Sequence, residues 1–104
     1  MTNIQELLPP DKIEVFCRHW RIVELSVFGS VLREDFRPDS DIDVLVTFEP
    51  DARWGLLELV DAEQQLRQLL GRPVDLIDRR AVENSENWVR RRSILTSART
   101  IYVR

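Results

Sequence analysis

The sequence predicts a small α/β fold, in which a mixed β-sheet of three to four strands packs against helices that lie mainly on one of its faces. Short apolar runs alternate along the chain with longer segments whose apolar residues recur at helical spacing, and this alternation is typical of such folds. The chain has 104 residues, of which 43% are hydrophobic and 32% are charged. Because these fractions are those of a globular domain with a core, we expect residues 1–104 to form a single domain.

Two helical segments are expected before the first strand. Residues 4–8 allow one helical turn, and a second helix begins at Pro10 or Asp11 because proline is well tolerated in the first turn of a helix. A core-facing stripe at helical spacing is formed by Ile13, Phe16, Cys17 and Trp20. Cys17 is therefore interpreted as a small buried apolar residue and not as a nucleophile.

Two strands and a turn are expected in the middle of the chain. The apolar run 23–28 predicts the first strand, residues 30–35 a short helix or turn, and residues 41–48 the second strand. Because side chains alternate along a strand, Asp41 and Asp43 point to the same face of the sheet, roughly 7 Å apart along the backbone. The apolar residues between and after them then point into the core.

The clearest helix is expected over residues 56–70, with Gly71 as the residue that ends it. Its inner face is predicted to contain Leu56, Leu59, Val60, Glu63, Leu66 and Leu70. Glu63 alone interrupts the apolar pattern of that face. Trp54, just before this helix, is expected to pack on the core rather than to stack beneath a base.

The last third of the chain predicts two strands and a further helix. Residues 74–77 form the third strand, and residues 100–103 form the last one. Between them, a helix that is capped by Asn84 or Ser85 runs to about Ala98. The inner side of that helix is expected to contain Trp88, Arg91 or Arg92, and Leu95.

Two patterns in the middle of the chain indicate chemistry with phosphate and a metal ion. The like charges of Asp41 and Asp43 repel each other unless they are compensated, and Mg²⁺ prefers carboxylate oxygens combined with substrate phosphates. Gly29 would let a phosphate approach the backbone closely, Ser30 supplies a hydroxyl, and the N–H groups that follow favour an anion. Each pattern alone also fits a solvent-exposed strand start with Ser40 capping a turn, or an ordinary turn with an N-cap, but their combination is more specific.

The pair Gly29-Ser30, followed after ten residues by Asp41-Ile42-Asp43, resembles the signature of the DNA polymerase β-like nucleotidyltransferase superfamily, and in particular of its minimal members, the MNT domains. Arg33 and Ser40 stand where those proteins commonly carry Arg and Ser, and Val74-Asp75-Leu76-Ile77 resembles the strand that bears their third carboxylate. The resemblance extends from about residue 23 to residue 103. Glu34 is a departure, since relatives often have Gly there, but it removes no catalytic group.

The resemblance implies a Mg²⁺-dependent enzyme that uses ATP as the nucleotide donor. It assigns catalysis and the binding of two Mg²⁺ ions to Asp41, Asp43 and Asp75, and the binding of the nucleotide and its phosphates to Gly29, Ser30, Arg33 and Ser40. Asp78, at the end of the third strand, competes with Asp75 for the role of third carboxylate. A salt bridge from Arg33 to Glu34 or Asp35 is the alternative to phosphate binding.

MNT proteins are typically paired with a small helical HEPN protein, an RNase toxin for which the MNT protein is the antitoxin. The resemblance therefore implies AMPylation, the transfer of AMP to a tyrosine hydroxyl of a HEPN partner, as in type VII toxin–antitoxin systems. One alternative is an antitoxin that acts by occlusion with little or no catalysis. Another is a nucleotidyltransferase that modifies a small molecule such as an antibiotic. A homo- or hetero-oligomer is compatible with each of these functions.

Charge and composition limit the other functions that the chain could have. The net charge of −3 argues weakly against a general nucleic-acid-binding protein. The run Arg90–Arg92 is interpreted as a solvent-exposed face, with docking to a partner or to RNA as alternatives. Cys17 cannot form an internal disulfide, which fits the cytoplasm, and neither a signal peptide nor a membrane-spanning run is expected.

Overall fold

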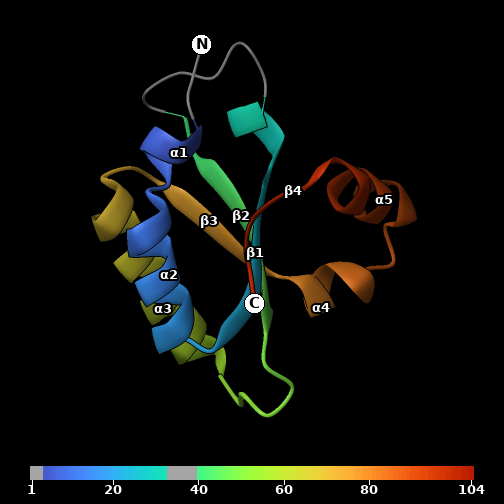
Figure 1. The fold of residues 1–104 in the computed structure, drawn as a ribbon. Coiled ribbons are helices and arrows are strands. Elements are labelled where there is room, and N and C mark those ends of the chain that lie inside the picture. The colour runs from blue at the N-terminus through green and yellow to red at the C-terminus, as the bar shows by residue number, and fades with distance from the viewer. Residues whose placement is uncertain (1–3, 33–39) are drawn as a thin grey trace.

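The structure, a computed structural model, describes residues 4–32 and 40–104, without the side chains of Gln5 and Ser30. Over these residues it has a mixed four-stranded sheet with the strand order β3-β2-β1-β4. Helices lie on both sides of this sheet, as Figure 1 shows with the strands between them. The α/β fold class and the mixed sheet are therefore confirmed.

The four strands agree with the predicted ones to within one residue at each end. β1 (Ile22–Phe28) and β2 (Ile42–Phe48) form the central antiparallel pair. β4 (Arg99–Val103) is antiparallel to the other side of β1, whereas β3 (Val74–Asp78) is parallel to β2. Because a parallel pair requires a long crossover connection, the helix between β2 and β3 determines where β3 can lie.

The helices form a layer on each face of the sheet. α2 (Pro10–His19) and α3 (Leu56–Leu70) cover one face, and α1 (Ile4–Leu7) precedes α2. α4 (Arg79–Glu83) and α5 (Trp88–Ser97) lie against the other face. No helix in the described part of the chain has the length and the apolar composition that crossing a membrane would require.

The larger of the two hydrophobic clusters lies between the sheet and helices α2 and α3. It contains the predicted stripe of Ile13, Phe16, Cys17 and Trp20. Burial raises the pKa of the Cys17 thiol to about 12, so this side chain is neutral near pH 7 and far from the thiolate form that reacts. The interpretation of Cys17 as a core residue is confirmed.

A smaller cluster lies on the other face of the sheet, beneath α4 and α5. Phe28 of β1 and Leu45 of β2 pack there with Val82 of α4 and Ile94 of α5. All four are 8% exposed or less, and their burial holds the two helices on this face. Helices were expected mainly on one face of the sheet, and the larger cluster lies on that face. On the other face, α4 and α5 add a second, smaller layer of helices.

The inner face of α3 is rotated relative to the prediction. Gly71 ends the helix in the left-handed conformation with φ = 69°, as expected. The buried residues are Ala62 and Leu66, whereas Leu56 is 76% exposed and Val60 is 42% exposed, so their assignment to the inner face was wrong. Ala62 has a small apolar side chain, and a pattern dominated by large apolar residues therefore does not reveal its burial.

The helix predicted to begin at Asn84 or Ser85 begins instead at Trp88, and the separate short helix α4 precedes it. The first backbone N–H groups of a helix need acceptors outside the helix. The Asp78 carboxylate accepts such a bond at 2.9 Å at the start of α4, and the Asn87 side chain accepts one at 3.1 Å at the start of α5. The cap of the predicted helix is therefore Asn87 and not Asn84 or Ser85, and α4 is a helix that was not predicted.

The inner side of α5 also differs from the prediction. Ile94 is the buried residue of this helix, and Leu95 packs partly against the smaller cluster. Trp88 was predicted to lie on the inner side, but it is 61% exposed. The helix is thus anchored by its second half, and its first turn contributes little to the core.

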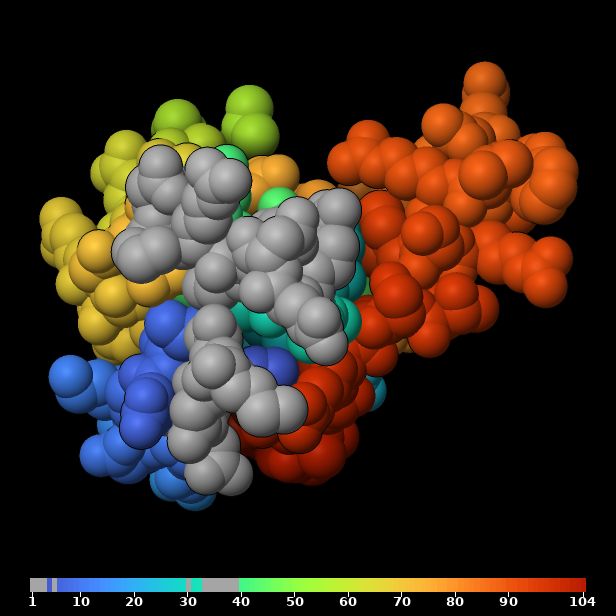
Figure 2. All heavy atoms as spheres, turned by 90° about the horizontal axis from the view of Figure 1, so that it is seen from above, coloured from blue at the N-terminus to red at the C-terminus, as the bar shows by residue number. Residues whose placement is uncertain are grey.

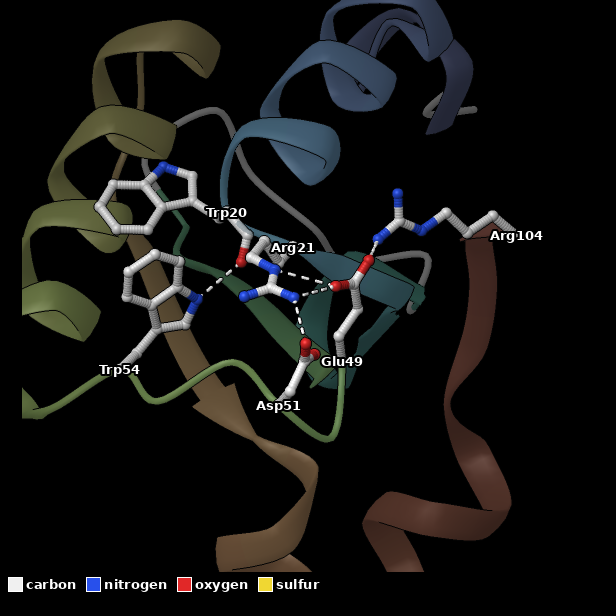
Figure 3. A network of polar contacts seen from close by, with 6 residues as sticks. All are labelled: Trp20, Arg21, Glu49, Asp51, Trp54 and Arg104. Carbon is white, nitrogen blue, oxygen red and sulfur yellow. Dashed lines mark hydrogen bonds and ion pairs between the residues drawn. The ribbon is translucent and has the colours of Figure 1, made fainter.

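A network of charged side chains joins the ends of three segments at the end of the sheet where β1 begins and β2 ends (Figure 3). The guanidinium of Arg21 contacts the carboxylates of Glu49 and Asp51 at 2.8 and 2.7 Å, and Arg104 also pairs with Glu49. The hydrogen bond from Arg21 lowers the pKa of Asp51. The network therefore ties the C-terminal residue to the loop that follows β2.

Trp54 packs against the core as predicted, beside this network. Its ring lies edge-on to that of Trp20, with the ring centroids 5.5 Å apart. Its indole N–H donates a hydrogen bond of 2.7 Å to the backbone carbonyl of Trp20. Because the polar end of the ring is satisfied inside the protein, Trp54 has a structural role.

Candidate active site

The acidic residues of β2 and β3 lie side by side on one face of the sheet. In the parallel pairing of these strands Asp43 is aligned with Asp75, and aligned residues on neighbouring strands, about 4.8 Å apart, project to the same face. Ile42 and Val44 belong to the larger core cluster, so Asp43 points to the opposite face, where α4 and α5 lie. Asp43 is half-buried and Asp75 is exposed.

Asp41 lies at the same end of the sheet, immediately before β2, and it is exposed. The backbone N–H of Ile42 donates a hydrogen bond of 3.0 Å to the carbonyl of Pro73, which joins the start of β2 to the residue before β3. Asp41 is therefore near Asp43 in sequence and at the end of the sheet where β3 also begins. It stands one residue outside the strand that was predicted to include it.

Gly29 lies against Asp43 at the end of β1. Phe28, the last residue of β1, pairs with Asp43, and Gly29 follows it with φ = 76°, a conformation that residues with a Cβ rarely adopt. A Cβ on Gly29 would lie 2.4 Å from Oδ2 of Asp43. Glycine is thus required here by its conformation and also by the space that the Asp43 carboxylate occupies. From the sequence, the close approach of a phosphate to the backbone was the reason expected for a glycine at this position.

The other predicted nucleotide-binding residues are described only in part. The 3-10 helix η1 (Gly29–Leu32) follows β1 and covers the first part of the segment predicted as a short helix or turn. Ser30 belongs to η1, but its side chain is outside the described part, and Arg33 lies outside the described residues. Ser40 is half-buried and directly precedes Asp41. The phosphate-binding roles of Ser30, Arg33 and Ser40 stay predictions.

The donor atoms of the site fit Mg²⁺ that is bound together with a nucleotide. Within the described part of the chain, no three His, Cys, Asp or Glu side chains form a group that could hold a metal ion. Mg²⁺ usually takes only one or two carboxylates from a protein and completes its coordination with water and substrate phosphates. The aligned carboxylates of Asp43 and Asp75 are hard oxygen donors of this kind. The structure thus aligns Asp43 with Asp75, but within the residues that it describes it does not gather Asp41, Asp43 and Asp75 into one group that could hold a metal ion without the nucleotide.

Two side chains of α3 secure the backbone on either side of Asp75. Glu63 accepts a hydrogen bond of 2.9 Å from the backbone N–H of Leu76, Arg67 donates one of 3.0 Å to the carbonyl of Val74, and the two side chains form an ion pair. β3 is an edge strand, so these backbone groups have no strand partner. The pair thus fixes Asp75 from outside the sheet. Sequence reasoning missed this role, although the signal was Glu63 itself, a charged residue on a predicted inner face.

Asp78, the competitor of Asp75, has a different function in the structure. It lies three residues further along β3, where it is aligned with Val46 of β2. Its carboxylate caps α4 through the N–H of Arg80 and also contacts the guanidinium of Arg80 at 3.2 Å. Asp78 therefore helps to hold α4 in place. Asp75, and not Asp78, is the carboxylate aligned with Asp43.

A small mixed sheet that carries adjacent carboxylates beside a Gly-Ser turn is the arrangement expected from the sequence resemblance to nucleotidyltransferases. Comparison with known families agrees with this class, because the family model of the nucleotidyltransferase domain matches residues 11–101. The chain therefore belongs to the nucleotidyltransferase domain family, and it is an enzyme of the nucleotidyltransferase class.

The chain is similar to a named adenylyltransferase and to chains of solved toxin–antitoxin complexes. The protein adenylyltransferase MntA of Thermococcus cleftensis is 38% identical over 77 residues, which cover 74% of this chain and 75% of that protein. A chain of a solved toxin–antitoxin complex with AMP-PNP aligns with a TM-score of 0.71 at 20% identity, covering 93% of this chain and 75% of that one. A chain of the complex between a tri-AMPylated Shewanella oneidensis HEPN toxin and an MNT antitoxin aligns with a TM-score of 0.63 at 19% identity, covering 95% and 73%. These two structural likenesses establish the fold.

The variants Asp75→Asn and Asp78→Ala are expected to have opposite effects. Asp78→Ala removes the cap of α4 and should lower the free energy of unfolding by about 1 kcal/mol, with nucleotidyl transfer retained. Asp75→Asn keeps the shape of an exposed side chain, so stability should stay within about 0.5 kcal/mol, but transfer should fall by about 100-fold. Urea unfolding and a transfer assay measure the two effects. The reverse pattern would assign the third carboxylate to Asp78.

Proposed function

We propose that this chain is a protein adenylyltransferase, which uses Mg²⁺ and ATP to transfer AMP to a hydroxyl group of a partner protein. The observation that carries the proposal is the contact between Gly29 and Asp43 beside the aligned residue Asp75. This arrangement unites the two halves of the Gly-Ser and Asp-x-Asp pattern at one end of the sheet. The name of the Thermococcus cleftensis relative supports the choice of a protein as the acceptor.

In the proposed reaction the oxygen of the acceptor hydroxyl attacks the α-phosphorus of ATP. The bond from that phosphorus to the α–β bridging oxygen breaks, and pyrophosphate leaves. Bound Mg²⁺ would supply a Lewis acid that stabilises charge on the entering and leaving oxygens, and Asp41, Asp43 and Asp75 would hold it, as two ions, with the triphosphate.

The residues around the metal would orient the reactants. Asp75, which is exposed and thus open to an incoming acceptor, would take the proton of the acceptor hydroxyl. Gly29 and Ser30 would hold the β- and γ-phosphates, with Arg33 and Ser40 beside them, so that the pyrophosphate leaves in line with the attacking oxygen.

The partner that we propose is a HEPN-family toxin, with a tyrosine as the acceptor. The two structural relatives are toxin–antitoxin complexes, and one of them contains a tri-AMPylated HEPN toxin. A transferred AMP adds negative charge, which would repel RNA from a nearby RNA-cleaving site. This chain would then be the antitoxin of a type VII system. Because ATP and RNA substrates are found in the cytoplasm, we propose that it works there.

The proposal is tested by incubating the chain with Mg²⁺, ATP and a purified HEPN-family protein. ATP labelled at the α-phosphate should label the HEPN protein, whose intact mass should rise by whole AMP units, and peptide mapping should place the label on a tyrosine. ATP labelled at the γ-phosphate should leave the HEPN protein unlabelled, because pyrophosphate is released. Labelling from the γ-phosphate would contradict nucleotidyl transfer. Neutralisation of the toxin by an Asp41→Asn/Asp43→Asn variant would instead support occlusion.

A further inference from the structure

The first turn of α5 exposes apolar side chains that the fold does not use. Trp88 is 61% exposed and Val89 is 58% exposed, whereas Ile94 anchors the same helix in the smaller cluster. Figure 2 shows the orange part of the chain, which includes the start of α5, projecting from the body of the molecule. Neighbouring exposed apolar residues on a projecting turn are typical of an interaction site rather than of a surface that contacts only water.

The same helix carries a local excess of positive charge. From Trp88 to Arg99 the sequence contains Arg90, Arg91, Arg92 and Arg99 but no acidic residue. All of the ion pairs that the described part of the chain contains involve other residues. The Arg91 guanidinium is held by two backbone carbonyls, and Arg90 and Arg92 are exposed. Since the whole chain has a net charge of −3, this basic surface is a local feature.

The position of α5 relates this surface to the active site. Ile94 packs in one cluster with Phe28 and Leu45, and Phe28 pairs with Asp43 and adjoins Gly29. Helix α5 therefore lies against the face of the sheet to which Asp43 points. A protein bound to α5 would therefore lie on the same side of the sheet as Asp43, which is the side that an acceptor hydroxyl must reach.

We propose that the exposed face of α5, formed by Trp88, Val89 and Arg92, docks the protein that accepts AMP. Arg92 lies one helical turn after Trp88 and three residues after Val89, so the three share one face. The partner surface has an apolar recess with a carboxylate at its rim, because it must match an exposed Trp and an exposed arginine. Trp and Arg are the residues that most often dominate protein–protein binding, and complementary charge sets the orientation and rate of association. The proposal rests on the proposed function, since the docked protein is the one that is modified.

A protein explains this surface better than single-stranded RNA does. Trp and Arg would also contact RNA, but Val89 has no aromatic face on which a base could stack. The net negative charge of the chain also disfavours a polyanion. RNA binding is therefore the alternative that the experiment must separate from the docking of a protein.

The test measures binding and transfer separately, with a purified HEPN-family protein as the probe. Trp88→Ala and Arg92→Glu should each raise the Kd by at least about 10-fold in isothermal titration calorimetry. The wild-type Kd should rise with salt concentration. In the transfer assay, kcat/KM for the partner should fall in proportion to binding, whereas kcat at saturating partner should change by less than about 2-fold.

Matched variants control for the loss of apolar area and for the change in charge. Leu57→Ala removes a side chain that is 79% exposed on α3, and Arg53→Glu makes the same change in net charge as Arg92→Glu at another exposed position. Both should bind the probe like the wild type. Asp43→Asn should bind it normally and fail to transfer AMP, so docking and catalysis are distinguished.

The outcomes separate this inference from the proposed function. Loss of binding in the α5 variants supports the docking surface even if the wild type transfers no AMP, a result that would reject the proposed function alone. Normal binding in the α5 variants overturns the docking surface, whatever the transfer assay shows. If a labelled oligouridine binds the wild type and loses affinity in these variants while the HEPN protein does not, the surface binds RNA and the inference is wrong.

Discussion

The Asp43→Asn variant is expected to lose nucleotidyl transfer by at least about 100-fold while remaining folded. Asn has the shape of Asp but lacks the charge that would hold Mg²⁺ and the triphosphate. Asp43 is aligned with Asp75, so the substitution also removes a like charge from the same face, and stability should change by less than about 1 kcal/mol. Initial rates with ATP labelled at the α-phosphate and a urea unfolding curve measure both quantities.

Asp61→Asn is the matched control for Asp43→Asn. Asp61 is an exposed aspartate on α3, away from the carboxylates at the start of β2 and β3. The substitution makes the same change in net charge, and transfer should remain within about 2-fold of the wild type. If Asp43→Asn transferred AMP as fast as Asp61→Asn does, Asp43 would have no part in the chemistry.

The Gly29→Ala variant is expected to lose both stability and activity. An alanine at φ = 76° costs about 1–2 kcal/mol because its Cβ crowds the backbone in the left-handed region. Its Cβ would also lie 2.4 Å from Oδ2 of Asp43, so the carboxylate must move. A displaced catalytic group reduces rates by about 100-fold. The variant should therefore unfold at lower urea concentration and transfer AMP at least about 10-fold more slowly.

Gly71→Ala separates these two effects. Gly71 has nearly the same backbone conformation, with φ = 69°, but a Cβ there would have no atom within 4 Å. The variant should show a comparable loss of stability from its backbone conformation with transfer close to that of the wild type. Equal transfer rates in the Gly29→Ala and Gly71→Ala variants would show that the contact between Gly29 and Asp43 does not matter for catalysis.

Local sequence patterns were sufficient to predict the strands and the face to which Asp43 points. Alternation along β2 placed Ile42 and Val44 in the core and Asp43 on the opposite side, and the structure has the same arrangement. The helical stripe that includes Cys17 was equally clear. Such features depend on residues that are close in sequence, where the period of the pattern is set by the backbone geometry.

Features that depend on contacts between distant segments could not be predicted in this way. Glu63 looked like an interruption of an apolar stripe, but it accepts the backbone N–H of Leu76. Asp78 caps α4, a helix that was not predicted, and Asn87 caps α5, although several polar residues nearby were equally plausible caps. The contact of Gly29 with Asp43 joins two strands whose register the sequence alone does not specify.

The most direct test of the account is a crystal structure with Mn²⁺ and α,β-methylene-ATP, in which a carbon replaces the bridging oxygen of the bond to be broken. Anomalous scattering from Mn²⁺ should give a peak about 2.0–2.2 Å from a carboxylate oxygen of Asp43, with the triphosphate beside Gly29 and with Asp75 facing the α-phosphate. A triphosphate bound elsewhere on the chain, or Mn²⁺ bound without contact to Asp43 or Asp75, would contradict the assignment of this end of the sheet as the active site.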